Sequence, residues 1–284
     1  MEKIAIVIDS AGDISPELAK IKGIYYLPLY ININEKFLKD RVDINPSDFY
    51  DYMKSTDDLP GTSLPAPGDI MALLEKVKAD GFDKAIIICI SSKLSGTYNL
   101  CDMIEVDGLE TYAFDSKNLT MAEGFLGILA KKMVDEGKSF DEIIRSLEKA
   151  RSNSKVFFTI ETFKYIVEGG RVPKSFGKIS DVLSVKPIIS VNNEDGKIKL
   201  LKIVRGERGA LRHLYKLAKE NLSDVKNYYM FIGHGDNLDM ANKLEDKLKD
   251  FIGGASLFIK DQISPTLGVN TGPGLFGFAL MKLD

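Results

Sequence analysis

Cysteine and histidine are scarce in this chain of 284 residues. The two cysteines, Cys89 and Cys101, are too few for the disulfide framework of a small secreted protein. The two histidines, His213 and His234, stand apart and have no further ligands at the spacing of a metal site. We therefore expect a fold without disulfides, with no bound metal and no cofactor.

Long apolar runs and an excess of basic residues are missing as well. No apolar stretch approaches the roughly 20 residues that cross a bilayer, so we expect no stable membrane insertion. The formal net charge of −3 gives no hint of the basic face that duplex-binding proteins carry, so nucleic acid is not an expected partner. Residues 1–6 run directly into a strand-like segment, so we expect no secretory signal and a cytoplasmic protein.

What the chain does contain is an ordinary globular composition, with 44% hydrophobic and 28% charged residues. Its first half alternates strand-like and helix-like segments, which is typical of a parallel sheet covered by helices. The strands are expected at 4–8, 24–30, 85–90 and 111–114. The helices are expected to begin at residue 16 and at Ser95, and to cover 46–54, 68–79, 120–136 and 140–150.

The second half carries a different pattern. The turn signal at 193–196 separates two strand-like runs, 186–191 and 197–204, and predicts an antiparallel hairpin. Helices are expected at 207–220 and 238–250, and strands at 228–233, 255–260 and 275–282. We place a domain boundary in the polar segment 151–155. The prediction is an α/β protein of two domains, a parallel-sheet domain over 1–153 and a mixed-sheet domain over 154–284.

Two glycine motifs suggest nucleotide binding and fail on context. The segment 272–277 matches Gly-x-Gly-x-x-Gly, but only seven residues follow it, too few for the helix and strand of a dinucleotide site. The segment 137–139 resembles the end of a P-loop, but Lys132 occupies the position of its first glycine. We interpret Ser139 as a helix cap. Asp9 and Asp13 are expected to hydrogen-bond the loop after the first strand.

Two loops rich in hydroxyl groups give the strongest chemical signal. Residues 91–99 follow the most apolar strand, where free backbone N–H groups and serine hydroxyls suit a carboxylate or phosphate; an ordinary capped helix would show the same residues. Residues 61–65 form a second cluster, which would share the ligand if the sheet order brings the loops together. Arg171 could pair with an anion, contact a partner protein or bridge the domains.

Five segments in this order resemble the DegV family. They are Ile8-Asp9-Ser10-Ala11-Gly12-Asp13, Thr62-Ser63-Leu64-Pro65, Ser91-Ser92-Lys93-Leu94-Ser95-Gly96-Thr97-Tyr98, Gly169-Gly170-Arg171 and Leu267-Gly268-Val269-Asn270-Thr271-Gly272-Pro273-Gly274. The resemblance covers nearly the whole chain. It implies a non-catalytic protein that binds a long-chain fatty acid and presents the carboxylate to a separate fatty acid kinase catalytic subunit, which forms an acyl-phosphate for phospholipid synthesis.

The resemblance also implies where the ligand lies. It assigns the acyl chain to the N-terminal domain, for which we consider Ile86, Ile88, Phe125, Leu126 and Leu129 as tunnel residues, with plain core packing as the alternative. It assigns ligand contacts to Thr62, Ser63, Ser92, Ser95, Gly96, Thr97, Asn270 and Thr271. Arg171 and Arg205 are partner or interdomain positions.

Position 270 departs from the family, which commonly has a histidine there. Because Asn270 carries no charge, we expect neutral donors to hold the carboxylate. Two other functions stay open at this point, a stand-alone lipid sensor and a small-molecule kinase.

Overall fold

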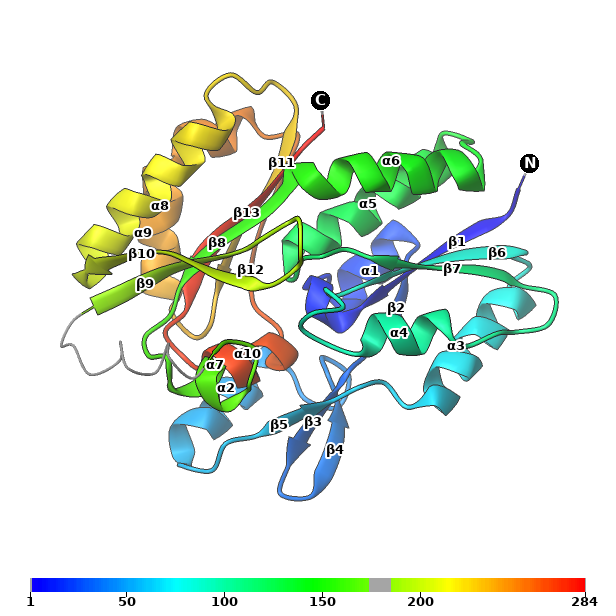
Figure 1. The fold of residues 1–284 in the computed structure, drawn as a ribbon, viewed down its shortest axis with the longest axis horizontal. Coiled ribbons are helices and arrows are strands. Elements are labelled where there is room, and N and C mark those ends of the chain that lie inside the picture. Colours follow the sequence, from blue (N-terminus) through cyan, green and yellow to red (C-terminus); the bar gives the residue numbers. More distant parts are fainter. Residues whose placement is uncertain (1, 174–184, 284) are drawn as a thin grey trace.

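The first sheet consists of parallel strands buried on both faces. The structure, a computed structural model, describes residues 2–173 and 185–283 (Figure 1). The strand order is β2 (Tyr25–Leu27), β1 (Ile4–Asp9), β6 (Lys84–Cys89) and β7 (Glu110–Asp115). Alternate residues of β1 face opposite sides, so Val7 packs toward α3 (Pro67–Ala79) while Ile8 packs toward α5 (Met121–Asp135).

The second sheet is mixed, as the hairpin signal predicted. Its strands follow the order β10 (Ile198–Arg205), β9 (Val185–Val191), β8 (Ser154–Thr159), β13 (Phe276–Lys282), β11 (Tyr228–His234) and β12 (Leu257–Gln262). All neighbours are antiparallel except β11 and β12. One face packs on α8 (Gly206–Leu222) and α9 (Leu238–Gly254), and the other faces α5.

A small antiparallel sheet was not predicted. It contains β4 (Lys36–Lys39), β3 (Tyr30–Ile33) and β5 (Gly61–Ser63). The expected single strand at 24–30 is wrong, because β2 ends at Leu27 and the chain enters β3 of the other sheet at Tyr30. Pro28 lies between them and has no N–H to continue the ladder of the first sheet.

Helix starts follow their capping residues. Ser15 accepts a hydrogen bond from the backbone of Leu18 before α1 (Pro16–Lys22), and Asn45 does the same for Asp48 before α2 (Pro46–Ser55). Ser139 and Glu142 form a reciprocal capping box at α6 (Phe140–Asn153). Two short helices escaped prediction, α7 (Lys164–Glu168) and α10 (Pro265–Thr271). Within the described part of the chain, no helix has the length and apolarity to cross a membrane.

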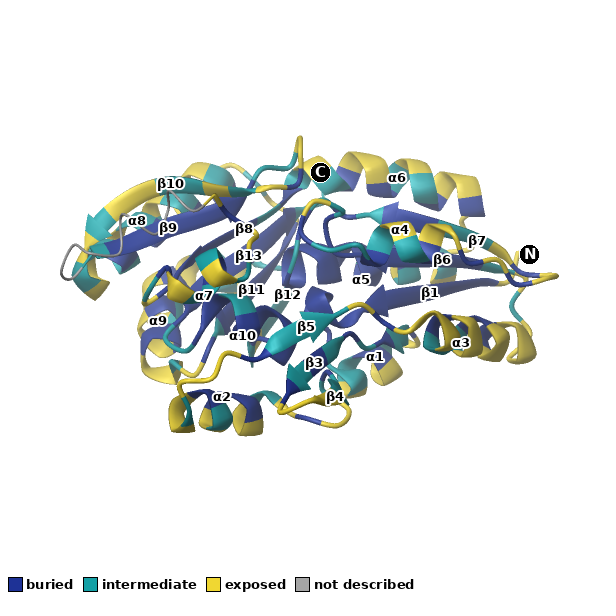
Figure 2. Ribbon diagram, turned by 60° about the horizontal axis from the view of Figure 1, so that its bottom comes forward, coloured by how far each residue is buried: buried dark blue, intermediate teal, exposed yellow. Residues whose placement is uncertain are grey.

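One hydrophobic core joins the two large sheets. Helix α5 packs against β1 and β6 on one side and against β8 and β13 on the other. Figure 2 shows these strands buried, while the outward faces of α3, α6 and α8 are exposed. Helix α6 ends at Asn153 and β8 begins at Ser154, so no linker separates the sheets. The division into domains at this point stays a prediction.

Candidate functional site

An apolar cavity lies between the mixed sheet, the loop after β6, and helices α7 and α10. Its empty space is about 840 Å³, a figure that includes the open solvent at its mouth. The apolar residues that line it are Leu29, Ile90, Leu94, Leu119, Val156, Phe158, Ile166, Ile198, Phe231, Ile263, Leu267, Leu275 and Phe278.

The predicted tunnel residues do not line this cavity. Ile86, Ile88, Phe125 and Leu126 are fully buried in the core between the sheets, and Leu129 packs against that core. In this structure they pack in the core, as the alternative reading expected, and their role as tunnel residues stays a prediction. The floor of the cavity comes instead from the second half of the chain, because β8, β11 and β13 turn one face of the mixed sheet toward it.

Polar side chains from distant segments meet at this cavity. Thr62 reaches it from β5, Ser95 from the loop after β6, and Asn270 and Thr271 from α10. The Oγ atoms of Ser95 and Thr97 lie 2.9 Å apart in a hydrogen bond. The two hydroxyl loops therefore share one cavity, as the sequence suggested they could.

The other predicted contacts are engaged elsewhere. Ser63 accepts a hydrogen bond from Asn32 Nδ2 at 2.8 Å, and Ser92 donates one to Asp115 at 2.6 Å. Neither residue lines the cavity, and neither Gly96 nor Thr97 does. The expected helix start at Ser95 is also wrong. Helix α4 (Thr97–Asp102) begins two residues later and has only six residues.

Arg171 brings a positive charge to the cavity. Its Nε donates to the carbonyl of Leu94 at 3.2 Å, and its guanidinium also donates to the carbonyl of Gly169. The bond to Leu94 joins the two halves of the chain, so Arg171 does bridge them. Within the described residues Arg171 has no carboxylate partner, and the residue is exposed at the cavity wall. A positive charge thus lies at the cavity wall.

Asn270 has an amide oxygen without a partner. Its Nδ2 donates to the carbonyl of Thr266 at 3.4 Å, whereas its Oδ1 is buried and accepts no hydrogen bond from the described residues. A Cβ atom on Gly169 would lie 2.2 Å from this oxygen, so any larger residue at 169 would force the Asn270 side chain to move. Position 270 thus presents an uncharged polar group at the cavity.

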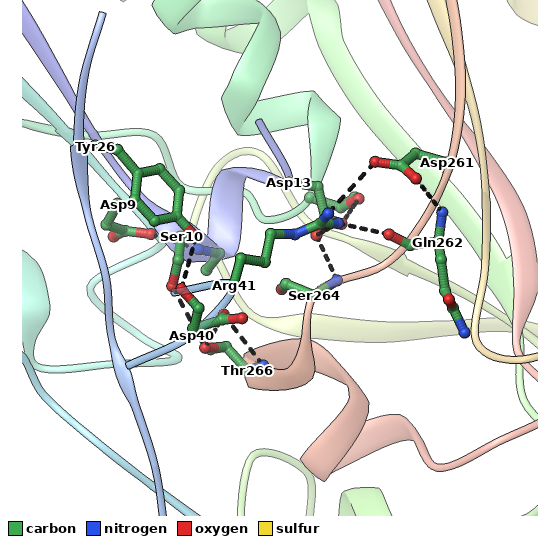
Figure 3. A network of polar contacts seen from close by, with 12 residues as sticks. Asp9, Ser10, Asp13, Tyr26, Asp40, Arg41, Asp261, Gln262, Ser264 and Thr266 are labelled. Carbon is green, nitrogen blue, oxygen red and sulfur yellow. Dashed lines mark hydrogen bonds and ion pairs between the residues drawn. The ribbon is translucent and has the colours of Figure 1, made fainter. Parts of the chain in front are cut away.

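A buried polar network stands behind the cavity wall (Figure 3). Thr266, which lines the cavity, donates its hydroxyl to Asp40, and Thr120 donates its hydroxyl to Asp13 at 2.5 Å. The guanidinium of Arg41 lies 3.6 Å from Asp13. Because both threonine hydrogens are already donated to carboxylates, these two hydroxyls are poor partners for a ligand carboxylate.

Burial changes the acidity of this network. Desolvation raises the pKa of Asp40 to about 6, although Thr266 and Arg41 oppose the shift. Desolvation likewise raises the pKa of Asp9 to about 6, against the backbone N–H groups of Ile90 and Ala11, which donate to it at 2.8 and 2.9 Å. The bond from Ala11 confirms that Asp9 binds its own loop.

Arg205 lies away from this cavity. It lines a separate groove between β10 and α8, together with Lys202, Arg212, His213 and Lys216. Burial lowers the pKa of His213, and the nearby Lys202 and Lys216 lower it further. Lysine and arginine side chains therefore make this groove basic.

Several cavity residues had no distinguishing signal in the sequence. Val156, Phe158 and Phe231 occur in apolar strand segments and look like ordinary core residues. Pro265 at the first position of α10 is a helix-start signal that could have placed Thr266 and Asn270 on one helical face.

Comparison with known proteins places the chain among relatives of the same fold. The model of the DegV family, described as uncharacterised protein, matches residues 3–283. A DegV domain-containing protein of Clostridium acetobutylicum is 37% identical over 99% of this chain and 100% of its own length.

Two solved structures are similar over their whole length. The structure of DegV from Bacillus subtilis, called a fatty acid binding protein, has a TM-score of 0.90 at 26% identity and covers 99% of this chain and 100% of its own. A stearic acid-binding protein from Eubacterium ventriosum has a TM-score of 0.82 at 26% identity, covering 99% of this chain and 98% of its own.

Proposed function

The chain belongs to the DegV family, and from that premise we propose that it binds one long-chain fatty acid in the cavity and presents the carboxylate to a separate kinase subunit. The observation that carries the proposal is a cavity lined mostly by apolar residues, with hydroxyl groups and Arg171 on its wall. The similar proteins of Bacillus subtilis and Eubacterium ventriosum, which carry fatty-acid-binding names, support it. The chain itself contributes no catalytic residue in this proposal.

Apolar transfer supplies most of the affinity. A sixteen-carbon acid buries about 15 methyl or methylene groups, which at ~0.8 kcal/mol each gives roughly 12 kcal/mol gross. Association and ordering of the chain cost several kcal/mol or more, so a net affinity between micromolar and nanomolar is expected.

The head group lies at the polar side of the cavity. Thr62 and Ser95 donate to the carboxylate, whose burial without partners would cost several kcal/mol. Arg171 adds a positive charge there, which revises the expectation of neutral donors alone. Asn270 completes this side with its uncharged amide.

The Thr62→Ala, Ser95→Ala double variant tests the head-group assignment. A hydrogen bond to a charged group contributes about 1.5–3 kcal/mol, so the double variant should bind palmitic acid at least about tenfold more weakly by isothermal titration calorimetry. The matched control is the Ser63→Ala, Ser92→Ala variant, which changes the same two loops but removes hydroxyls engaged by Asn32 and Asp115. Equal affinities for the two double variants would refute the assignment.

The kinase step is tested with the basic groove. We propose that Arg205 contacts an acidic surface of the kinase subunit, and that Arg205→Glu slows acyl-phosphate formation by a purified fatty acid kinase catalytic subunit. Palmitic acid binding should stay unchanged, because Arg205 does not line the cavity. If the wild-type chain binds the acid but supports no acyl-phosphate formation, the stand-alone lipid sensor replaces the kinase role. ATP turnover by the isolated chain would instead favour the small-molecule kinase.

A further inference from the structure

Two glycines lie side by side in the cavity floor. Gly233 of β11 pairs directly with Gly277 of β13, and Gly277 pairs on its other side with Phe158 of β8. Both glycines are buried and both line the cavity. Two neighbouring positions in the sheet therefore carry no side chain at the place where the cavity meets the sheet.

The ring of Phe231 occupies the space over Gly233. A Cβ atom on residue 233 would lie 2.6 Å from Phe231 Cε1, 3.1 Å from Phe231 Cζ and 3.1 Å from Ile263 Cγ2. Since carbon atoms approach no closer than about 3.5 Å without repulsion, the ring has this position only because residue 233 is glycine. Any side chain there would displace the ring.

Phe231 lies on the strand between the cavity and the core around α5. Among the cavity residues between β12 and the end of α10, Asn270 is half-buried. Thr266 and Ile263, which come earlier in the chain, are only 4% and 3% exposed. Phe231 is 1% exposed, and Tyr229, two residues away on the same strand face, packs against Phe125 at 5.6 Å between ring centroids. The ring of Phe231 thus separates the cavity from the closed core.

We propose that Gly233 and Phe231 together set the longest acyl chain that the cavity takes. This inference rests on the proposed fatty acid binding and adds the determinant of its chain-length selectivity. With the head group at Thr62, Ser95 and Arg171, the methyl end of the chain points toward Phe231. The position of one aromatic ring, fixed by the absence of one Cβ atom, then decides how many methylenes fit.

The test compares dissociation constants for saturated fatty acids of 12, 14, 16, 18 and 20 carbons. The Gly233→Ala variant should shift the optimum to shorter chains by about two carbons, because the displaced ring shortens the cavity. The Phe231→Leu variant should shift it to longer chains, because a smaller side chain opens the cavity toward the core. Each buried methylene changes the affinity about fourfold. A shift of the optimum by two carbons should therefore change the ratio of the affinities for two acids that differ by two carbons at least tenfold between variant and wild type.

The matched control is Gly253→Ala, the same chemical change on α9, where a Cβ atom would meet nothing within 4 Å. Its chain-length profile should equal that of the wild type. Gly233→Ala and Phe231→Leu profiles that match the wild type in folded protein would overturn the inference. If Gly233→Ala does not fold, the Phe231→Leu profile decides alone. Failure of the wild type to bind any of the five acids would instead overturn the proposed function itself.

Discussion

Single residues at this site depend on partners that lie far away in the sequence. Thr62 and Ser63 are neighbours with the same functional group, yet Thr62 lines the cavity and Ser63 is engaged by Asn32. The sequence predicts hydroxyl groups at the ends of strands, because loops after buried strands are positioned for binding. It does not distinguish a free hydroxyl from an engaged one, since the partner is set by tertiary structure.

Asp40 is a residue whose ionisation should affect the stability of the fold. It accepts hydrogen bonds from Thr266, but its Oδ1 is buried and has no partner among the described residues. Burial raises its pKa from 3.8 to about 6. The folded state therefore binds the proton more tightly than the unfolded state, so this group contributes stability below about pH 4 that is lost as the pH rises through 6.

The Asp40→Asn variant isolates that contribution. On going from pH 7.5 to pH 5, the unfolding free energy of the wild type should rise relative to the variant by about 1 kcal/mol, measured by urea denaturation. Asp69→Asn serves as the control. The pKa of Asp69 is lowered, mainly by Tyr30 and also by Lys39, so its effect appears only near and below pH 4. A difference between wild type and Asp40→Asn that does not change with pH would contradict the prediction.

At the scale of elements, the two short helices α7 and α10 decide where the cavity wall lies. Both are too short for a hydrophobic period to reveal them, since α7 has five residues and α10 has seven. They pack on each other through small residues. Gly169 lies against Asn270, and Gly272 lies under the ring of Tyr165. Longer elements with caps, such as α2 and α6, were predictable because their signals are local.

Gly272→Ala should break this packing. Residue 272 has a φ of 68°, and its Cβ atom would lie 2.1 Å from Tyr165 Cδ2. Gly170→Ala is a matched control, because Gly170 has a φ of 73° but no atom within 4 Å of the added carbon. Both variants strain the backbone by about 1–2 kcal/mol, and overpacking adds roughly 1–3 kcal/mol at residue 272. Urea denaturation should show the larger loss for Gly272→Ala, and equal losses would argue against the contact with Tyr165.

At the scale of the whole molecule, the alternation of strands and helices predicted the parallel sheet, and the turn at 193–196 predicted the antiparallel hairpin. The cavity could not be placed in the same way. Phe158 and Phe231 are apolar residues of buried strands whether they face a ligand or a helix. Whether such a residue faces the cavity or a helix depends on how the two sheets pack around α5. No local sequence pattern predicts that packing.

The shared core has a consequence for unfolding. Phe125 of α5 packs against Tyr229 of the mixed sheet, and Ser154 at the start of β8 donates a hydrogen bond to the carbonyl of Ala122 in α5. Arg41 also lies between Asp13 and Asp261, which belong to different halves of the chain. Neither large sheet is covered on both faces without α5, so we expect the two halves to unfold together although they were predicted as separate domains.

Calorimetry of the ligand-free chain tests this expectation. The wild type should show one transition whose calorimetric enthalpy equals its van't Hoff enthalpy. In Phe125→Ala, a cavity in the shared core should cost about 3–5 kcal/mol and move that single transition as a whole to lower temperature. Circular dichroism in the far-UV, for secondary structure, and near 280 nm, for tyrosine packing, should report the same midpoint. A second transition that stays at the wild-type temperature in Phe125→Ala would show instead that one half of the chain folds independently of α5.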